Sequence, residues 1–200
     1  MITALIPAYN EAESIGKVIG ETKAFADEVI VVDDGSEDDT GDISQKAGAT
    51  VITKEHQGYI KALKRGFQAA RGEIIVTLDA DGEHNPADIP KVVAPLVKGE
   101  ADLVLGSRKY IPSVSERLLG IMVRLRVDVK DHGTGFRALT KELAQTLSLR
   151  GKCTCSVLVL EAASKGAKIA EVPTTMREIS KERKKSGFIF SKWVIYCFKS

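Results

Sequence analysis

Short apolar runs rich in β-branched residues alternate with segments of helical period through the first half of the chain, and this alternation constrains the fold most. The expected strands are residues 3–6, 28–32, 50–53, 73–78 and 103–105, and the expected helices are residues 11–25, 39–47, 59–70 and 86–97. Strands that alternate with helices of about a dozen residues need crossover connections, which make the strands parallel and put helices on both faces. We therefore expect an α/β fold with a Rossmann-like, three-layer α/β/α arrangement around a mainly parallel mixed sheet.

The second half of the chain has a weaker pattern. It contains expected helices at residues 115–127 and 157–164, separated by a loop at residues 131–137. A chain of 200 residues fits one globular core, and no repeat of about 20 to 50 residues divides it. We expect a catalytic domain over residues 1–176 and a basic, aromatic segment over residues 177–200.

Composition excludes several classes of protein. With 44% hydrophobic and 28% charged residues, the chain is neither disordered nor membrane-embedded. Its longest apolar run near the end, residues 193–198, is far shorter than the roughly 20 residues that span a bilayer. The first residues lack the basic start and long apolar stretch of a signal peptide, and we expect a cytoplasmic protein with reduced cysteines.

Three polar clusters follow expected strands directly. Residues 7–11 follow the first strand, residues 33–36 the second and residues 79–82 the fourth. In parallel sheets, ligands bind beyond the carboxyl ends of the strands. We therefore expect all three clusters to open onto the same edge of the sheet.

The third cluster has the chemistry of a metal site. Asp79 and Asp81, separated by Ala80, emerge where an apolar strand ends. Hard carboxylate oxygens suit Mg²⁺ or Mn²⁺, which commonly uses one or two carboxylates and completes its shell with phosphate oxygens and water. An acidic turn between a strand and a helix is the alternative for an isolated motif of this kind.

The second cluster adds two more carboxylates, from Asp33 and Asp34. Asp34 is a candidate for binding a base or a ribose hydroxyl. Gly35 is expected to allow a tight turn, and Ser36 is expected to cap the next helix.

Taken together and in order, these motifs resemble those of the family 2 glycosyltransferases with the GT-A fold. The segments that carry the resemblance are 7–11, 33–36, Gly58 with Ala62 and Gly66, 79–82, 106–108 and 131–137. Within the family, the chain most resembles the dolichyl-phosphate mannose synthases and polyprenyl-phosphate glycosyltransferases. The resemblance covers about residues 2–176.

The resemblance implies a role for each matching residue. The donor would be bound by Pro7, Tyr9, Glu11, Val32, Asp34, Asp79, Ala80, Asp81 and Arg108. Asp79 and Asp81 would hold Mg²⁺ or Mn²⁺ against the donor diphosphate, and Asp81 and Arg108 would be the catalytic residues. Arg137 would face the acceptor, and Arg177 and Arg183 are candidates for a phosphate clamp.

The implied reaction moves a sugar, with inversion, from a nucleotide diphosphate donor such as GDP-mannose or a UDP-sugar to a polyprenyl or dolichyl phosphate. A phosphate monoester is largely ionised at neutral pH, so this acceptor needs no general base. Alternatives are a non-lipid acceptor, a donor-binding pseudoenzyme and a haloacid-dehalogenase-like phosphatase, whose Asp-x-Asp motif normally comes early in the chain.

The last 24 residues differ in character from the rest. Residues 177–200 contain seven basic residues against two acids, a net charge of +5, which leaves −3 for the first 176 residues of a chain whose total is +2. They also contain five of the eleven aromatic residues. This combination favours peripheral contact with the inner face of the cell membrane, with a helix packed on the sheet or a homodimer contact as alternatives. The net acidic remainder argues against nucleic acid as a partner.

Overall fold

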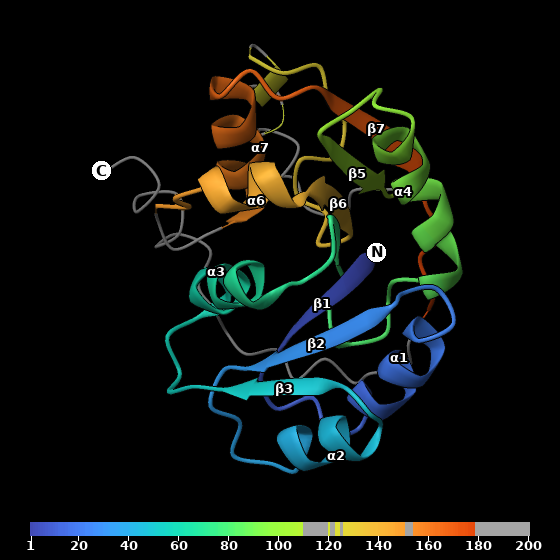
Figure 1. Cartoon of the computed structure of the whole chain (residues 1–200), viewed down its shortest axis with the longest axis vertical. Helices are drawn as coiled ribbons and strands as arrows, with labels where there is room; N and C mark the ends of the chain where they lie inside the picture. Colours follow the sequence, from blue (N-terminus) through green and yellow to red (C-terminus); the bar gives the residue numbers. More distant parts are fainter. Residues whose placement is uncertain (110–119, 121–122, 125, 151–153, 179–200) are drawn as a thin grey trace.

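Seven strands form one mixed sheet in the order β3-β2-β1-β4-β6-β5-β7 (Figure 1). The computed structural model describes residues 1–109, 120, 123–124, 126–150 and 154–178. The strands are β1 (Ile2–Ala8), β2 (Glu28–Asp33), β3 (Thr50–Thr53), β4 (Ile74–Thr77), β5 (Leu103–Ser107), β6 (Arg137–Thr140) and β7 (Ile169–Pro173). Only β6 runs antiparallel to its neighbours, β4 and β5. The expected mainly parallel mixed sheet is confirmed.

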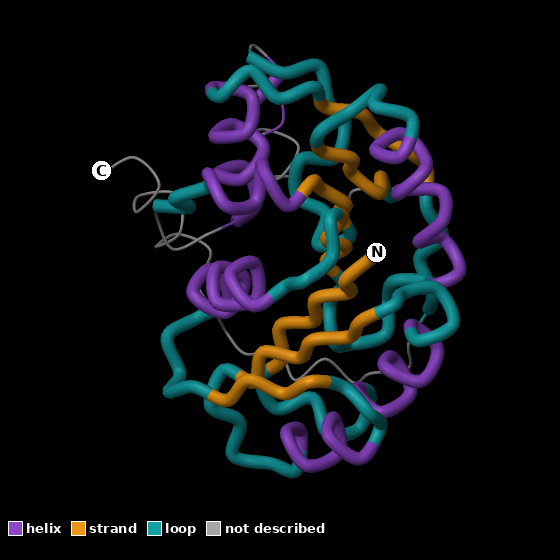
Figure 2. Tube along the Cα trace, viewed as in Figure 1, coloured by secondary structure: helices purple, strands orange, loops and turns teal. Residues whose placement is uncertain are grey.

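Helices cover both faces of this sheet, as Figures 1 and 2 show. The helices are α1 (Ile15–Thr22), α2 (Thr40–Lys46), α3 (Tyr59–Ala69), the 3₁₀ turn η1 (Pro86–Asp88), α4 (Ile89–Val97), α6 (Lys141–Thr146) and α7 (Thr154–Ser164). Alternate strand residues point to opposite faces. Leu5, Ile30 and Ile75 pack in the core beneath α3, α6 and α7. Ala4, Val31 and Val76 pack in the core beneath α1, α2 and α4. The three-layer prediction is therefore correct.

The close approach of α3 to β1 depends on a glycine. A Cβ atom on Gly66 would lie 2.2 Å from Cδ1 of Leu5, closer than any real packing contact. Because a helix buried face to face with a strand must exclude side-chain bulk at the contact point, a glycine lets the two backbones approach. The position of α3 matters for function because its first residue, Tyr59, reaches the acidic rim of the sheet.

The second half of the chain differs from the sequence-based expectation. The expected loop at residues 131–137 ends one residue early, because Arg137 begins β6. Strands β6 and β7 and helix α6 were not predicted, whereas α7 confirms the helix expected at residues 157–164. Of the helix expected at residues 115–127, residues 120, 123 and 124 are helical, whereas residues 126 and 127 form a turn and a bend. The other residues of that segment lie outside the described residues.

Two further predictions concern membrane-spanning helices and the C-terminal segment. Among the residues that the structure describes, no helix combines the length and apolarity needed to cross a membrane. Arg183 and the aromatic residues of the segment 179–200 lie outside those residues, so their predicted roles stay predictions.

Candidate active site

Hydrogen bonds join the first two polar clusters at the carboxyl ends of β1 and β2. The amide of Asn10 donates to Oγ of Ser36 over 3.0 Å, and the amide of Glu37 donates to Oδ1 of Asn10 over 2.8 Å. The amide of Glu11 donates to Oγ1 of Thr40 over 2.8 Å. The predicted convergence of these clusters is thus correct, but Ser36 does not cap the next helix. That helix, α2, begins at Thr40. The hydroxyl of Ser36 instead accepts the amide of Asn10 in the first cluster.

Asp34 is buried and takes its hydrogen bonds from the loop that follows β3. Its side chain is 5% exposed and forms an ion pair with Lys54. Its two carboxylate oxygens also accept from the amides of Gln57 and Gly58, over 3.0 and 2.8 Å. Gly35, with φ of +79°, makes the tight turn that the sequence predicts. Asp34 therefore positions residues 54–58. A ribose or base that binds Asp34 as predicted would have to share carboxylate oxygens that already accept these hydrogen bonds.

Asp79 follows β4 and contacts three other segments: the start of α3, the loop that contains His84, and the residues that lead into β6. The hydroxyl of Tyr59, at the start of α3, donates to Oδ1 of Asp79 over 3.2 Å. The amide of Asp79 donates to Nδ1 of His84 over 3.2 Å, and the His84 ring stacks on Phe136 at a centroid distance of 5.3 Å. A Cβ atom on Gly135 would lie 2.2 Å from Oδ2 of Asp79. The Asp79 carboxylate therefore rests directly on the backbone that leads into β6.

One cavity of about 200 Å³ gathers most of the predicted donor-binding residues. It is lined by Pro7, Tyr9, Glu11, Tyr59, Asp79, Ala80 and Asp81. The ring of Tyr9 also contacts that of His56, at a centroid distance of 4.3 Å. Val32 is not in this lining; it is fully buried in the core of the sheet. The cavity thus combines aromatic surface with three carboxylates, those of Glu11, Asp79 and Asp81, which suits a ligand that carries both rings and a metal-bound anion.

The carboxylates of this cavity fit a divalent cation that a ligand helps to hold. Asp79 is 37% exposed, and Oδ1 of Asp81 accepts the amide of Glu83 over 3.0 Å, which fixes the direction of that carboxylate. No group of three or more His, Cys, Asp or Glu side chains with metal-binding geometry occurs among the described residues. A complete protein cage is therefore absent there, whereas two carboxylates plus diphosphate oxygens and water would satisfy Mg²⁺ or Mn²⁺.

Arg108 is not among the residues that line this cavity, and a buried acid holds its side chain. Its Nε and Nη2 atoms each donate over 2.8 Å to the two oxygens of Asp131, which is 1% exposed. Burial would raise the pKa of the Asp131 carboxyl, but the hydrogen bonds and charge of Arg108 outweigh burial and lower it. Glu171 in turn accepts the amides of Lys130 and Asp131, over 2.8 and 2.7 Å. This chain of contacts fixes Arg108 at the end of β5.

The remaining predicted arginines occupy different places. The side chain of Arg177 has two partners in the fold. It forms an ion pair with Glu21, and its Nη2 donates to Oδ1 of Asn85 over 2.7 Å. Its amide also donates to the carbonyl of Glu83 over 2.8 Å. Arg177 therefore ties the chain after β7 to the loop that follows Asp81. Arg137 is buried in the sheet, with 1% exposure.

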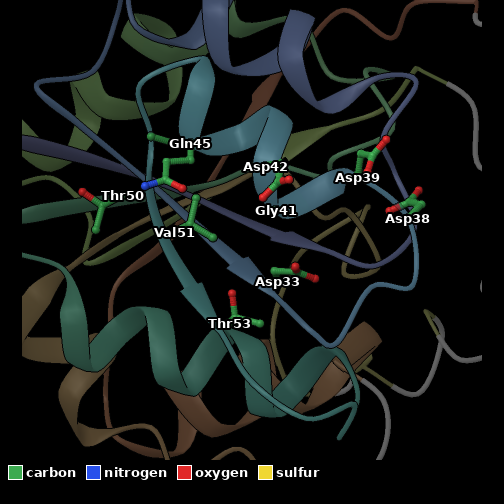
Figure 3. A pocket seen from close by; sticks show the side chains of 10 residues that line it. Asp33, Asp38, Asp39, Gly41, Asp42, Gln45, Thr50, Val51 and Thr53 are labelled. Atoms are coloured by element: carbon green, nitrogen blue, oxygen red, sulfur yellow. The ribbon is translucent and has the colours of Figure 1, made fainter.

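A larger hollow of about 540 Å³ lies away from these residues, between α2 and the edge strand β3 (Figure 3). Acidic side chains dominate it, including Asp33, Asp38 and Asp42. Asp33 and Asp38 are already engaged, with the amides of Ser36 and Ala12 respectively. Acidic residues alone do not make a site, and we place the functional centre at the smaller cavity, where aromatic and acidic groups converge.

Sequence reasoning missed several residues of the site. Tyr59 had a detectable signal, because a tyrosine opens the helix directly after Gly58 at the same sheet edge. Lys54 and His56 had no comparable signal, since their relation to Asp34 depends on how the loop after β3 folds back. The pairing of Asp131 with Arg108 also joins positions 23 residues apart in a poorly patterned region.

Comparison with known proteins finds a family match and related sequences. Residues 3–143 match the family model of Glycosyl transferase family 2. An uncharacterized protein of Methanocaldococcus jannaschii is 33% identical over 193 residues, which cover 84% of each chain. A dolichol-phosphate mannosyltransferase of Pyrococcus furiosus is 30% identical over 198 residues, covering 87% of this chain. The match spans only 56% of that enzyme's length.

The fold is also shared with solved glycosyltransferases. Glucosyl-3-phosphoglycerate synthase from Mycobacterium tuberculosis in complex with uridine diphosphate superposes with a TM-score of 0.81 at 28% identity, covering 98% of this chain and 77% of that one. The same enzyme has been solved with Mg²⁺ and uridine diphosphate, with a TM-score of 0.78 at 26% identity and 90% and 72% coverage.

Proposed function

Because this chain belongs to the family 2 glycosyltransferases and has their GT-A fold, we propose that it moves a sugar from a nucleotide diphosphate-sugar to a polyprenyl or dolichyl phosphate. The observation that carries the proposal is the single cavity that Tyr9, Glu11, Asp79 and Asp81 line together. This family membership does not agree with the phosphatase alternative. GDP-mannose and a UDP-sugar both stay open as donors.

Asp79 and Asp81 are the residues that would hold the divalent cation, as their fit to Mg²⁺ or Mn²⁺ indicates. When bound, such a cation neutralises charge on the diphosphate leaving group, an effect worth several kcal/mol in other enzymes. Solved structures of a family neighbour with Mg²⁺ and uridine diphosphate support this assignment. Tyr59 contributes by orienting Asp79 through its hydroxyl.

In the proposed transfer, an oxygen of the acceptor phosphate attacks the anomeric carbon of the sugar. The bond from that carbon to the diphosphate oxygen breaks, and the nucleoside diphosphate leaves with the electron pair. Arg108, fixed by Asp131, would place a permanent positive charge beside the developing anion, which stabilises the transition state because the charge is positioned in advance. Attack opposite to the leaving group inverts the anomeric configuration.

The lipid acceptor is supported by the relative named dolichol-phosphate mannosyltransferase, whereas the solved neighbour is named for a small phosphorylated acid. The basic, aromatic composition of residues 179–200 also favours a lipid acceptor at the inner face of the membrane. Peripheral membrane contact and a homodimer stay predictions. A donor-binding pseudoenzyme would bind nucleotide without turning it over.

The direct test replaces one carboxylate of the cavity. We expect Asp81→Asn to remove metal-dependent nucleotide binding and to lower turnover with citronellyl phosphate by at least about 100-fold, because one anionic oxygen ligand is lost. Binding is measured by calorimetry with Mn²⁺ and turnover by release of the nucleoside diphosphate. The anomeric configuration of the product, read by NMR, tests inversion.

The matched control is Asp39→Asn, which makes the same chemical change at an exposed residue whose side chain makes no capping hydrogen bond. This variant should bind and turn over like the original chain. Normal turnover in a folded Asp81→Asn protein would refute the metal assignment. Nucleotide binding without turnover of any phosphate acceptor in the unaltered chain would indicate a pseudoenzyme.

A further inference from the structure

The segment that follows Asp81 holds both aspartates of the cavity in place. The amide of Glu83 donates to Oδ1 of Asp81 over 3.0 Å, and Nδ1 of His84 accepts the amide of Asp79 over 3.2 Å. Residues 82–85, which connect Asp81 to the turn η1, belong to no helix or strand of the described structure. The placement of Asp79 and Asp81 therefore depends on tertiary contacts that this short segment makes elsewhere.

The chain after β7 supplies those contacts first through its backbone. His84 and Met176 form an isolated antiparallel bridge. The amide of Arg177 donates to the carbonyl of Glu83 over 2.8 Å. An isolated two-stranded pairing is marginally stable in water, and this one is a single residue pair long. The bridge therefore needs side-chain contacts beside it to stay in register.

The side chain of Arg177 provides such contacts. It forms an ion pair with Glu21 on α1, and its Nη2 donates to Oδ1 of Asn85 over 2.7 Å. The same oxygen of Asn85 accepts the amide of Ala87 over 3.3 Å, which caps η1. A planar guanidinium presents several donors in fixed directions, so one side chain can bond an acid and an amide at once. Arg177 thus joins α1 and the chain after β7 to the segment that follows Asp81.

We propose that Arg177 is a positioning residue for the metal motif rather than a phosphate clamp. It is in the lining of neither cavity described above, and its guanidinium already bonds Glu21 and Asn85. By holding Asn85 and the carbonyl of Glu83, it fixes the amide that Asp81 accepts. The inference rests on the proposed function, because it requires Asp81 to be a cation ligand. It differs from the clamp role that the family resemblance suggests for this residue.

The two roles predict opposite effects of Glu21→Gln. If Arg177 were a clamp that Glu21 holds back, loss of the acid would release the guanidinium and strengthen nucleotide binding. If Arg177 positions the metal motif, the same substitution loosens its hold on Asn85 and weakens cation binding. Glu21 lines neither cavity, so the substitution does not remove a contact with the ligand itself.

The test uses the full chain and its Glu21→Gln, Arg177→Met and Arg177→Lys variants. Glu100→Gln and Arg65→Met make the same chemical changes at exposed positions and are the matched controls. Binding of Mn²⁺ is measured by electron paramagnetic resonance with uridine or guanosine diphosphate present, since the signal of the free ion is lost on binding. Nucleotide affinity without metal, the melting temperature without ligand, and turnover with citronellyl phosphate are measured separately.

We expect Arg177→Met to raise the Mn²⁺ concentration for half-saturation by about 10-fold or more, the usual effect of losing a group that orients a metal ligand. Glu21→Gln should raise it by about 2- to 5-fold, because an ion pair that is one-third exposed is partly screened. Arg177→Lys should fall between the original chain and Arg177→Met, because it keeps the charge and loses the planar donors. Saturating Mn²⁺ should restore turnover in all three variants, and nucleotide affinity without metal should not change.

Tighter nucleotide binding in Glu21→Gln would indicate a clamp and overturn the inference. An equal loss of nucleotide affinity with and without Mn²⁺ in Arg177→Met would overturn it too, as would unchanged Mn²⁺ affinity in that variant. If Arg177→Met is unfolded at the assay temperature, Glu21→Gln decides between the two roles. If the original chain shows no Mn²⁺-dependent nucleotide binding, the metal assignment itself is wrong, and this inference fails with it.

Discussion

The carboxylates at the rim of the sheet divide into two groups by their hydrogen-bond partners. Asp33 and Asp34 accept backbone amides of nearby loops, and Asp34 also pairs with Lys54. Asp79 and Asp81 instead line the cavity, and within the described part of the chain each carboxylate accepts one hydrogen bond, from the Tyr59 hydroxyl and the Glu83 amide respectively. Carboxylates of the first group hold loops in place, whereas those of the second have oxygens to offer a cation. The same residue type therefore holds loops at one strand end and lines a cavity at another.

At the residue scale, Asp131 is predicted to matter for both stability and turnover. Asp131→Asn puts an amide group against the donors of Arg108 and removes the buried negative charge of this ion pair. We expect the free energy of unfolding to fall by about 2–3 kcal/mol, which lowers the melting temperature of a domain of this size by about 5–10 °C. Calorimetry measures the change. The exposed Asp128→Asn should change stability by less than about 0.5 kcal/mol.

The same pair predicts a pH dependence. The Asp131 pKa is lowered in the folded protein, so its carboxylate contributes stability that is complete above its ordinary pKa of 3.8. That contribution disappears as the pH falls through the lowered folded-state pKa. The difference in melting temperature between the original chain and Asp131→Asn should therefore be constant near neutral pH and shrink below about pH 4. A difference that persists undiminished at pH 2 would contradict the ion-pair explanation.

At the element scale, the antiparallel strand β6 is the feature that completes the site. It enters between β4 and β5, and its approach through Gly135 and Phe136 supplies the surface on which Asp79 and His84 rest. It also carries Arg137 to the same region. A wholly parallel sheet would place β5 directly beside β4 and would leave Asp79 without this backing. Strand β6 thus brings Arg137 and the backbone that supports Asp79 to the same part of the sheet.

Gly135→Ala tests this contact. The added methyl group would lie 2.2–2.6 Å from the Asp79 carboxylate, so Asp79 must move away. We expect metal-dependent nucleotide affinity to fall by about 10-fold or more, since small displacements of a preorganised ligand group are costly. Titration with Mn²⁺ and nucleotide measures the effect. In Gly20→Ala on α1, where nothing lies within 4 Å of the added group, affinity should stay unchanged and stability should rise by up to about 1 kcal/mol.

At the scale of the whole molecule, two cores separated by one sheet support the edge of the sheet at which the cavity lies. The core beneath α3, α6 and α7 holds Tyr59 in place, and the core beneath α1, α2 and α4 holds the loop from Asn85 into α4. Arg177 links the end of β7 back to Glu21 and Asn85. The cavity at this rim is lined by residues that follow β1 and β4 and by Tyr59 at the start of α3. Binding of a ligand there should stabilise the native state as a whole.

This coupling makes donor identity measurable by melting. A nucleotide at 100 times its dissociation constant adds about 2.7 kcal/mol to the stability of the native state. For a domain of this length, we expect the melting temperature to rise by about 5–10 °C. Uridine and guanosine diphosphates should be compared with and without Mn²⁺, and the larger rise identifies the donor base. An equal rise without any divalent cation would contradict the role assigned to Asp79 and Asp81.

The sequence alone determined the strand and helix order of the first half, the parallel sheet and the convergence of the polar clusters. These follow from local periodicity and from the rule that parallel strands end at one edge. The sequence did not predict the sheet order of the second half, because β6 is only four residues long and lies antiparallel between strands distant in the chain. Its backbone partners, rather than its own pattern, make it a strand.

Only the tertiary structure decided how the charged residues are used. A sequence shows that Asp34, Asp79, Arg108 and Arg137 are present, but their roles depend on which partners each one meets. Asp34 meets two amides and a lysine, Arg108 meets Asp131, and Arg137 meets no partner among the described residues. Hydrogen bonds and ion pairs act over about 3 Å between groups that are tens of residues apart in the chain. Such contacts exist only once the fold has brought the groups together.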